Sequence, residues 1–274
     1  MKKIAVIGLG IIGGSICASL ASAGIFTDGY ARNEDTVKKA IELGYIRKKA
    51  EKLSDYDVVF LAVPPKATIE YLENGEFKDG ALVMDICGVK KVLEDTVYAK
   101  KRNYRYVGTH PMAGKETSGL SSASPNLFKR ANLIITHAPD TKDEDVAEVK
   151  EYAKIMGFGK IVECTAEEHD KKIAITSQLA HIVSNAYVKS DEVRGCDGFT
   201  GGSFQDMTRI AGVDETVWTP LYAYNRENIL HELNGLIAHL ETYRDALQSQ
   251  DDEKLSDCLK EGRLIRETIK RRND

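Results

Sequence analysis

The chain has 274 residues, of which 42% are hydrophobic and 29% are charged, so it can bury the core of one large domain or of two ordinary ones. Its 38 Lys and Arg side chains are outnumbered by 42 Asp and Glu side chains, which leaves a net charge of −4. A negative net charge does not produce the positive electrostatic potential that attracts a phosphate backbone. We therefore expect no nucleic-acid partner.

The cysteines and the apolar segments exclude two further classes of protein. The five cysteines lie far apart and form no CxxC pair: Cys17, Cys87, Cys164, Cys196 and Cys258. We therefore expect reduced thiols in a cytoplasmic protein, with no disulfide framework and no metal site. Glycines interrupt the opening "MKKIAVIGLG", so we expect no signal peptide, and no later segment is apolar for long enough to predict a membrane span.

Short apolar segments alternate with amphipathic ones in the first part of the chain. Seven of them have the length and composition of strands, at 3–8, 28–32, 57–63, 81–86, 104–108, 132–137 and 160–164. Helical patterns lie between them, for example at 36–43 and 144–156, and Gly24, Gly44 and Gly157 follow such patterns as C-terminal caps do. This alternation predicts a mostly parallel sheet with helices on both faces.

The pattern changes at residue 165. Thr165 and Glu168 fit a capping box that opens a helix predicted to reach about Ser190, and a glycine-rich break follows. Beyond that break, helices are predicted at 214–250 and 251–272, without a convincing strand. We therefore expect an α/β domain over residues 1–164 and an all-α domain over residues 165–274.

The predicted helical domain has more apolar residues than a small bundle needs for its core. Examples are Leu221, Ile229, Leu233, Leu236, Ile237 and Leu240. We expect part of this surface to form a homodimer interface, and the alternative is that all of these residues pack within one chain.

The segment "GLGIIGGS" places a GxGxxG array directly between the first strand and the helix after it. Gly8 makes the tight turn, Gly10 lets a pyrophosphate approach the backbone, and Gly13 lets the helix pack closely on the strand. The array at the start of a β-α-β pattern is typical of a Rossmann-like dinucleotide-binding domain, although a glycine-rich turn selected for packing alone remains the alternative. We assign to the cofactor site Gly8, Gly10, Ile11, Ile12, Gly13, Val63, Pro64 and Gly88.

The end of the second strand indicates which dinucleotide is used. Domains that bind NAD usually carry an acid there, which accepts a hydrogen bond from the ribose 2′-hydroxyl. Here "GYARN" places Ala31 at that position, followed by Arg32 and Asn33, which we add to the cofactor site. An arginine without a neighbouring carboxylate favours a 2′-phosphate, so we predict NADP over NAD. The alternative is that Arg32 is merely exposed and both cofactors are used.

The segment "GTHPMAGKETSG", residues 108–119, places His110 where a predicted strand gives way to a loop. Ligands bind at the carboxyl ends of strands in open parallel sheets, and Ala113 and Gly114 leave room for one. A neutral imidazole there can accept a hydroxyl proton while a hydride leaves for nicotinamide. A histidine with a purely structural role is the alternative.

These residues also carry a resemblance to a known family. "HPMAGKETSG" resembles the HPxAGxExSG signature of the prephenate and arogenate dehydrogenase (TyrA) family. The similarity continues in "TSQLAHIVSNA", in "GGSFQDMTRIA" and at Trp218, and it covers nearly the whole chain. It implies a homodimeric enzyme of tyrosine biosynthesis that converts prephenate to 4-hydroxyphenylpyruvate by oxidative decarboxylation with NAD(P), with arogenate as the competing small-molecule substrate.

The resemblance also implies roles for individual residues. The catalytic set is His110 as the partner of the substrate hydroxyl, Arg209 as the partner of a substrate carboxylate, and His181. The implied substrate contacts are Lys115, Glu116, Ser177, Gly202, Gln205, Asp206 and Trp218, with Glu116 at the mouth of the pocket and Asp206 orienting Arg209. Spacing alone indicates that Ser177 and His181 share one helical face. For each of these residues an ordinary structural or surface role is the alternative.

Two departures from the family pattern affect this reading. Where the family has DxGSVK, this chain has "DICGVK", so Gly88 stands in place of a serine whose hydroxyl lies between histidine and nicotinamide. Water, or a loop shifted by Cys87, would then have to supply that hydrogen bond. Gln205 stands where some members carry a lysine, and losing this cation weakens the case for prephenate as the exclusive substrate.

The sequence is also compatible with two other functions. A β-hydroxyacid dehydrogenase or imine reductase has a similar build and depends on a lysine of the helical domain, for which Lys171 and Lys172 are available. A redox sensor that binds NADP without turnover needs no base, and Gly88 in place of the serine fits that function.

Overall fold

The computed structural model describes residues 2–114 and 117–269, so Lys115 and Glu116 lie outside the described residues. Contacts between Cα atoms divide the chain into two compact units, Met1–Asn225 and Arg226–Asp274. The first unit holds a sheet with its covering helices, and the second holds two long helices.

Within the described residues, seven strands form one sheet in the order β2-β1-β3-β4-β5-β6-β7. All seven predicted strands are confirmed: β1 (Ile4–Ile7), β2 (Asp28–Tyr30), β3 (Val58–Leu61), β4 (Leu82–Asp85), β5 (Arg105–Pro111), β6 (Asn132–Thr136) and β7 (Lys160–Cys164). Neighbouring strands are parallel except for the antiparallel pair β5 and β6. The prediction of a mostly parallel sheet is therefore confirmed. β1, β3 and β4 are buried along their whole length, which explains their continuous apolar sequences.

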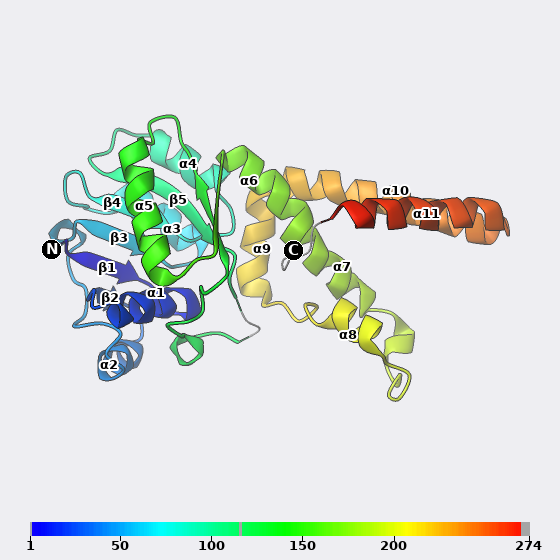
Figure 1. Ribbon diagram of the computed structural model, residues 1–274, viewed down its shortest axis with the longest axis horizontal. Coiled ribbons are helices and arrows are strands. Elements are labelled where there is room, and N and C mark those ends of the chain that lie inside the picture. The colour runs from blue at the N-terminus through cyan, green and yellow to red at the C-terminus, as the bar shows by residue number, and fades with distance from the viewer. Residues whose placement is uncertain (1, 115–116, 270–274) are drawn as a thin grey trace. The chain divides into compact units, whose positions relative to one another are not determined.

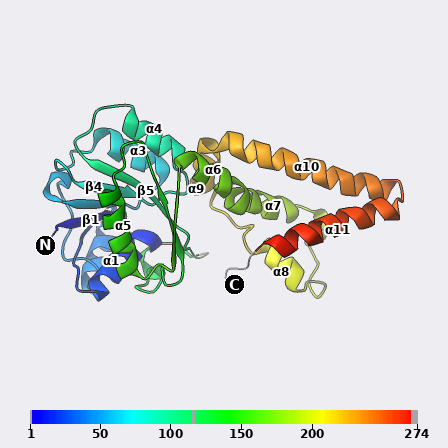
Figure 2. The same ribbon diagram turned by 45° about the horizontal axis from the view of Figure 1, so that its top comes forward.

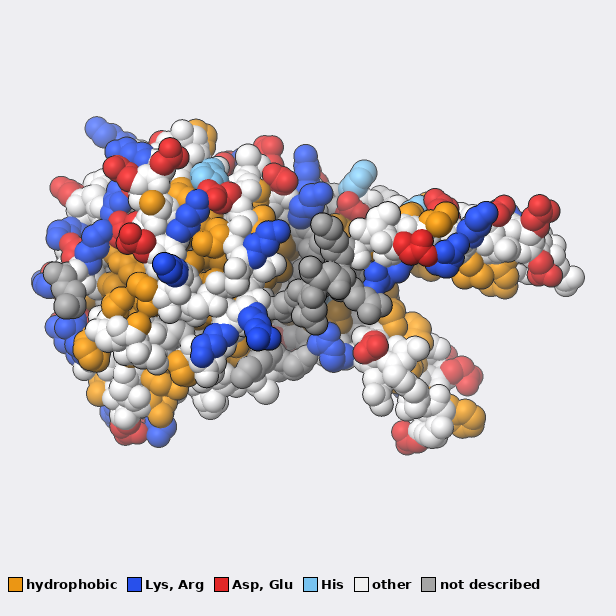
Figure 3. Space-filling view, in the orientation of Figure 1, with side chains coloured by type: hydrophobic (Ala, Val, Ile, Leu, Met, Phe, Trp, Pro, Cys, Tyr) orange, Lys and Arg blue, Asp and Glu red, His pale blue; other side chains and the backbone are white. Residues whose placement is uncertain are grey.

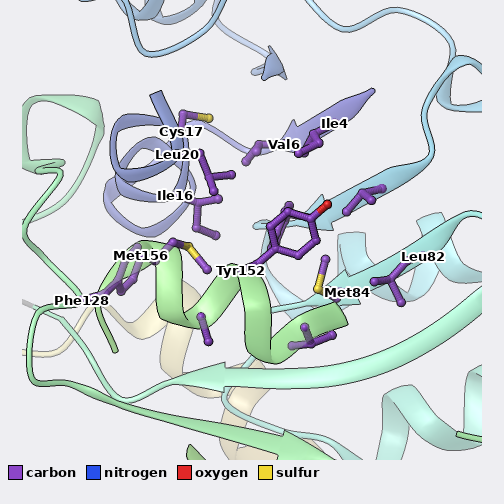
Figure 4. Packing of buried hydrophobic residues seen from close by; sticks show 14 of the residues in the cluster. Ile4, Val6, Ile16, Cys17, Leu20, Leu82, Met84, Phe128, Tyr152 and Met156 are labelled. Carbon is purple, nitrogen blue, oxygen red and sulfur yellow. The ribbon is translucent and has the colours of Figure 1, made fainter. Parts of the chain in front are cut away.

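Two layers of helices cover the sheet, as predicted (Figure 1). α1 (Ile11–Ser22) and α5 (Asp143–Met156) lie on one face, while α3 (Pro65–Asn74) and α4 (Lys91–Tyr98) lie on the other. β1 shows why both faces need cover: Ile4 and Val6 enter the core under α1 and α5, whereas Ala5 and Ile7 enter the core under α3 and α4. Figure 4 shows the first of these cores. α2 (Glu34–Glu42) follows β2.

The glycines predicted as C-terminal caps have the backbone conformation that this role requires. Gly24, Gly44 and Gly157 have φ values of 76°, 69° and 83°, a region that residues with a Cβ rarely adopt. Each follows its helix within two residues, after α1, α2 and α5 respectively. These caps end the helices where the sequence pattern indicates.

β5 is longer than its sequence pattern predicts, and the difference affects His110. The strand was predicted to end at residue 108 but continues to Pro111, because antiparallel pairing with β6 places His110 opposite Ile134 and Pro111 opposite Leu133. His110 therefore lies in the last rungs of a sheet ladder rather than on a loop. The ladder restrains its backbone, whereas a loop would leave it free to move.

A long interrupted helix begins where the capping box predicts. The hydroxyl of Thr165 accepts a hydrogen bond of 3.1 Å from the Glu168 amide and caps α6 (Ala166–Ile173). A π-helical segment, Ala174–Gln178, joins α6 to α7 (Leu179–Tyr187), which ends three residues before the predicted limit. Single π turns often mark functional sites, and this one carries Ser177.

The remaining helices depart from the prediction in two ways. The glycine-rich break contains the start of a short helix, α8 (Gly202–Thr208), and the helix predicted from 214 onward is divided at Asn225 into α9 (Glu215–Tyr224) and α10 (Arg226–Gln248). The first compact unit extends through α9, because α6 packs on α4 and β6 and α9 packs on α3. The boundary between the two compact units therefore follows Asn225, whereas the sequence pattern changes at residue 165.

The second unit is an antiparallel pair formed by α10 and α11 (Asp252–Thr268), which run side by side (Figure 2). Gln250 has a φ of 58° in the turn, and the Asp251 side chain caps α11 at the Lys254 amide. Apolar patches lie between charged side chains on the visible face of this unit (Figure 3). Its exposed large apolar residues are Leu230, Ile237, Leu240, Leu247, Leu259, Leu264, Ile265 and Ile269. Two helices alone cannot bury them all.

A search for helices that could cross a bilayer finds none of sufficient length and apolarity in the described part of the chain.

Candidate functional site

The carboxyl ends of β1, β3, β4 and β5 bring the predicted site segments to one edge of the sheet. β1 is followed by the glycine array, β3 by Val63 and Pro64, and β4 by the loop that holds Gly88. β5 ends with His110 and Pro111 at the same edge, since β4 and β5 are parallel. Ligands bind at this edge in open parallel sheets.

The three glycines of the array meet different steric demands. Gly8 has a φ of +101°, and a Cβ there would lie 2.2 Å from the Ala62 carbonyl oxygen. A Cβ on Gly13 would lie 1.8 Å from the Gly8 carbonyl oxygen, so helix α1 packs on the turn only through a glycine. By contrast, a Cβ placed on Gly10 would have no described atom within 4 Å apart from Gly10 itself and its two neighbours in the chain. Gly10 therefore borders the open space that a pyrophosphate needs.

The N-terminus of α1 is suited to an anion. No described side chain caps it at Gly10, and its described first turn holds no acidic residue. The amides of Ile11 and Ile12 thus keep their donors at the positive end of the helix dipole. Together with the open space at Gly10, these residues fit a dinucleotide's pyrophosphate.

The end of β2 carries an arginine, and the acid within β2 points into the core. Arg32 is exposed, and Asn33 caps α2 by accepting from the Asp35 amide at 2.8 Å. The acid on β2, Asp28, is buried and accepts from the Tyr56 hydroxyl at 3.0 Å, so it faces the core rather than a ribose. The side chain of Asn33 thus has a structural role, and Arg32 carries the NADP prediction.

The partly buried His110 begins a polar series that continues into the interior and was not predicted from the sequence. Its Nδ1 lies 2.9 Å from Nε2 of His169, and Nδ1 of His169 lies 2.7 Å from Oδ1 of Asp170. Asp170 also accepts from the amides of Lys90 at 2.8 Å and Lys91 at 2.9 Å. His169 and Asp170 are 1% and 2% exposed, in the segment "EEHDKK" on α6. In the sequence, only the adjacent His and Asp within a helix of mainly charged residues indicated that this segment could contribute to a site.

Both histidines are held in the neutral form. Burial lowers the pKa of His110 well below the ordinary 6.5, and the neighbouring His169 and the Lys90 cation lower it further. Burial also lowers the pKa of His169 and outweighs its hydrogen bond to Asp170, which acts in the opposite direction. A neutral imidazole can accept a proton at physiological pH.

The positive charge beside the histidines is itself buried and paired. Lys90 is 1% exposed and forms a salt bridge with Asp85, which is fully buried. Asp85 also accepts from the Tyr106 hydroxyl at 2.7 Å and from the Cys87 amide at 2.8 Å. Lys90 is therefore paired with Asp85 and has a structural role beneath the site.

Gly88 faces the ring of His110. A Cβ at Gly88 would lie 3.6 Å from Cε1 and 3.7 Å from Nε2 of His110, and 3.8 Å from Leu221 of α9, all ordinary contacts. Cys87 does not replace a serine here, because its thiol lies 3.3 Å from the Thr68 hydroxyl in the core. Burial raises the pKa of this thiol to about 12, so it stays protonated.

Ser177 and Trp218 both contact His181. Nδ1 of His181 donates to the Ser177 carbonyl at 2.9 Å, and its ring lies 4.0 Å from the Trp218 ring between centroids. Trp218 in turn contacts Tyr222, with a centroid distance of 5.6 Å. This aromatic wall comes from α7 and α9. His181 contacts the backbone of Ser177 and not its side chain. The role of the Ser177 hydroxyl in substrate binding therefore stays a prediction.

α8 carries or adjoins the other predicted substrate residues. Gly202, Gln205 and Asp206 lie in it, and Arg209 is its C-cap. The Ser184 hydroxyl of α7 donates to the Met207 carbonyl at 2.6 Å and holds α8 in place. The roles of these residues stay predictions, as do those of Lys115 and Glu116. Among the described residues, no group of three or more His, Cys, Asp or Glu side chains could hold a metal ion.

A dinucleotide turn and a neutral histidine at one edge of a Rossmann-like sheet define a nicotinamide-dependent dehydrogenase. Residues 19–162 match the family model for the nucleotide-binding domain of prephenate dehydrogenase, and residues 165–261 match the model for its dimerization domain. The chain therefore belongs to the prephenate dehydrogenase family, and the resemblance found in the sequence is confirmed.

Individual relatives agree with this membership. Prephenate dehydrogenase of Lactococcus lactis is 29% identical over 283 residues, which cover 98% of this chain and 78% of the relative. The structure of prephenate dehydrogenase from Aquifex aeolicus in complex with hydroxyphenyl propionate and NAD+ has a TM-score of 0.85 and 27% identity, and covers 98% of this chain and 99% of its own. Synechocystis arogenate dehydrogenase has a TM-score of 0.82 and 26% identity, and covers 97% and 99% respectively.

Proposed function

We propose that the protein oxidises prephenate to 4-hydroxyphenylpyruvate with loss of CO2, and that arogenate is the competing substrate. The observation that carries this proposal is the position of His110: a neutral ring, at the ligand edge of the sheet, with Nε2 directed past Gly88. Names of the relatives support the substrate class. The HPxAGxE stretch, which has no role in a β-hydroxyacid dehydrogenase, argues against that alternative.

The oxidised nicotinamide supplies an acceptor for the hydride on the substrate's hydroxyl-bearing ring carbon. His110 Nε2 accepts the hydroxyl proton as that carbon becomes a carbonyl. When the carboxylate leaves as CO2, the electron pair of the broken bond completes the aromatic ring, and the oxygen recovers its proton from His110. Prephenate and oxidised cofactor thus give 4-hydroxyphenylpyruvate, CO2 and reduced cofactor without net proton release.

The helical segment holds the diacid substrate in this proposal. The guanidinium of Arg209 suits a carboxylate because it can donate two parallel hydrogen bonds. His181, stacked on Trp218, borders the ring of the substrate. Replacing Arg209 by alanine should raise KM at least about tenfold, since charge-assisted hydrogen bonds contribute about 1.5–3 kcal/mol. Unchanged KM in that variant would contradict its role.

The cofactor is NADP in preference to NAD. Exposed Arg32 at the end of β2 and the inward orientation of Asp28 support this choice, because a carboxylate at the ribose would repel a 2′-phosphate. The ratio of kcat/KM for the two cofactors tests it. A clear advantage for NAD would overturn it.

The protein acts as a homodimer through its long helices. The exposed apolar side chains of α10 and α11 and the match of residues 165–261 to a dimerization domain support this assembly.

One assay separates the functions considered. The protein is mixed with oxidised cofactor and either prephenate or arogenate, and reduced cofactor is followed by absorbance. Turnover with either diacid supports the proposal, and the ratio of the two rates shows whether Gln205 permits both substrates. A cofactor-binding sensor would give no turnover, and a β-hydroxyacid dehydrogenase would oxidise only hydroxyacids.

A further inference from the structure

The series His110, His169 and Asp170 connects the site to the interior through hydrogen bonds whose direction can be derived. The Asp170 carboxylate accepts from the amides of Lys90 and Lys91, and its Oδ1 lies 2.7 Å from Nδ1 of His169. A carboxylate has only acceptor oxygens, so the hydrogen in its bond to His169 must lie on the ring nitrogen. Nδ1 of His169 therefore carries a hydrogen and donates it to Asp170.

The direction of the next bond follows from the neutral state of His169. A neutral imidazole with a hydrogen on Nδ1 has an unprotonated Nε2, which can only accept. His110 must then donate from Nδ1, since the two ring nitrogens lie 2.9 Å apart. Nε2 of His110 is left unprotonated, and this atom lies on the side of the ring toward Gly88.

We propose that His169, oriented by Asp170, is a positioning residue that fixes His110 in the tautomer with its hydrogen on Nδ1, so that Nε2 is the proton acceptor. The catalytic consequence rests on the proposed function, but the tautomer does not. The opposite tautomer would present an N–H to the substrate hydroxyl and could accept no proton from it.

The same series stabilises the charge that forms during the reaction. When Nε2 of His110 takes the hydroxyl proton, the imidazolium donates from Nδ1 to His169, and His169 donates to the Asp170 carboxylate. The Asp170 carboxylate, at the far end of the series, thus stabilises the positive charge that forms on His110. Lys90 opposes it, but the Asp85 carboxylate, bonded to Tyr106, offsets that cation.

Two substitutions at His169 separate positioning from simple packing. His169→Phe keeps an aromatic ring and removes the acceptor, while Asp170 keeps its two amide donors. His169→Gln can place a carbonyl oxygen near the position of Nε2 and so restores an acceptor for His110. We expect kcat to fall about 10²–10⁴-fold in His169→Phe, as for a base in the wrong tautomer, with KM changed less than about threefold. His169→Gln should recover at least about tenfold of that loss.

The tautomer is measured without substrate by ¹⁵N NMR of the imidazole nitrogens, with the His110 signals assigned from a His110→Asn sample. We expect His110 protonated on Nδ1 in the wild type and largely on Nε2 in His169→Phe. A kcat of His169→Phe within about threefold of wild type, an unchanged tautomer, or a His169→Gln variant as slow as His169→Phe would each overturn the inference. If the wild type turned over neither diacid, the proposed function would fail while the NMR result still decided the tautomer.

Discussion

His110 turns the Cε1–Nε2 edge of its ring toward Gly88, where an added Cβ would make contacts of 3.6 and 3.7 Å with those two atoms. These distances are ordinary van der Waals contacts, so the glycine is not required by space. The position that holds a serine elsewhere in the family is thus open beside the base, and a hydroxyl there would lie close to Nε2.

Gly88→Ser should therefore be tolerated and should increase turnover. A hydroxyl that hydrogen-bonds and orients the His110 ring contributes about 0.5–1.5 kcal/mol, which predicts a rise in kcat of about 2–10-fold. Gly88→Ala is the matched control, because it adds the Cβ without the hydroxyl. If the alanine variant gained as much as the serine variant, the hydroxyl would not be the cause.

The lowered pKa of His110 predicts how activity depends on pH. Because the base stays neutral well below its ordinary pKa of 6.5, kcat/KM should hold nearly constant from neutral pH to below 6.5. Its acidic limb should then appear at a pKa well under 6.5. A limb centred at or above 6.5 would show that the ring is solvated like a free histidine.

Stability should follow the same two histidines. Both have a lower pKa in the folded chain than in the unfolded one, so the unfolded chain takes up protons first as the pH falls through about 6.5. The free energy of unfolding should decrease from there downward, and the titration of these rings should not change it above about pH 7.5. Urea titrations of wild type and His169→Phe test this, and a variant with an unaltered pH slope would contradict it.

Arg32 predicts the cofactor preference. Arg32→Ala should lower kcat/KM for NADP about 10–100-fold and leave that for NAD within about threefold, because it removes charge-assisted bonds to a 2′-phosphate. Lys38→Ala is a suitable control, since Lys38 is an exposed cation on α2 that pairs with Asp35. An equal loss with both cofactors would assign Arg32 to the fold instead.

The exposed apolar residues of α10 predict a dimer in solution. Leu240 is 57% exposed, so Leu240→Glu should cost a monomer little, whereas at an apolar interface an unpaired carboxylate is costly. Analytical ultracentrifugation should show a dimer for wild type and for the control Arg244→Glu, an exposed position on the same helix. A Leu240→Glu protein that stays as dimeric as wild type would place the interface elsewhere.

The parts of the fold that local chemistry determines were predictable from sequence. The positive φ of Gly8, the close packing of Gly13 on the Gly8 carbonyl and the cap at Thr165 depend on neighbours in the chain. The true end of β5 was not predictable, because it depends on pairing with β6, more than twenty residues later. His169 was missed for the same reason: within α6 it follows two glutamates, and its burial arises only when α6 packs on α4 and β6.

The most direct test of the account is the turnover of His110→Asn with prephenate. A side chain that cannot act as a base should reduce kcat about 10²–10⁴-fold, with KM changed less than about threefold and the same melting temperature as wild type. His137→Asn, which removes a half-exposed histidine paired with Glu163, should keep full activity. A folded His110→Asn enzyme that turns over within about threefold of wild type would contradict the assignment of His110 as the proton acceptor.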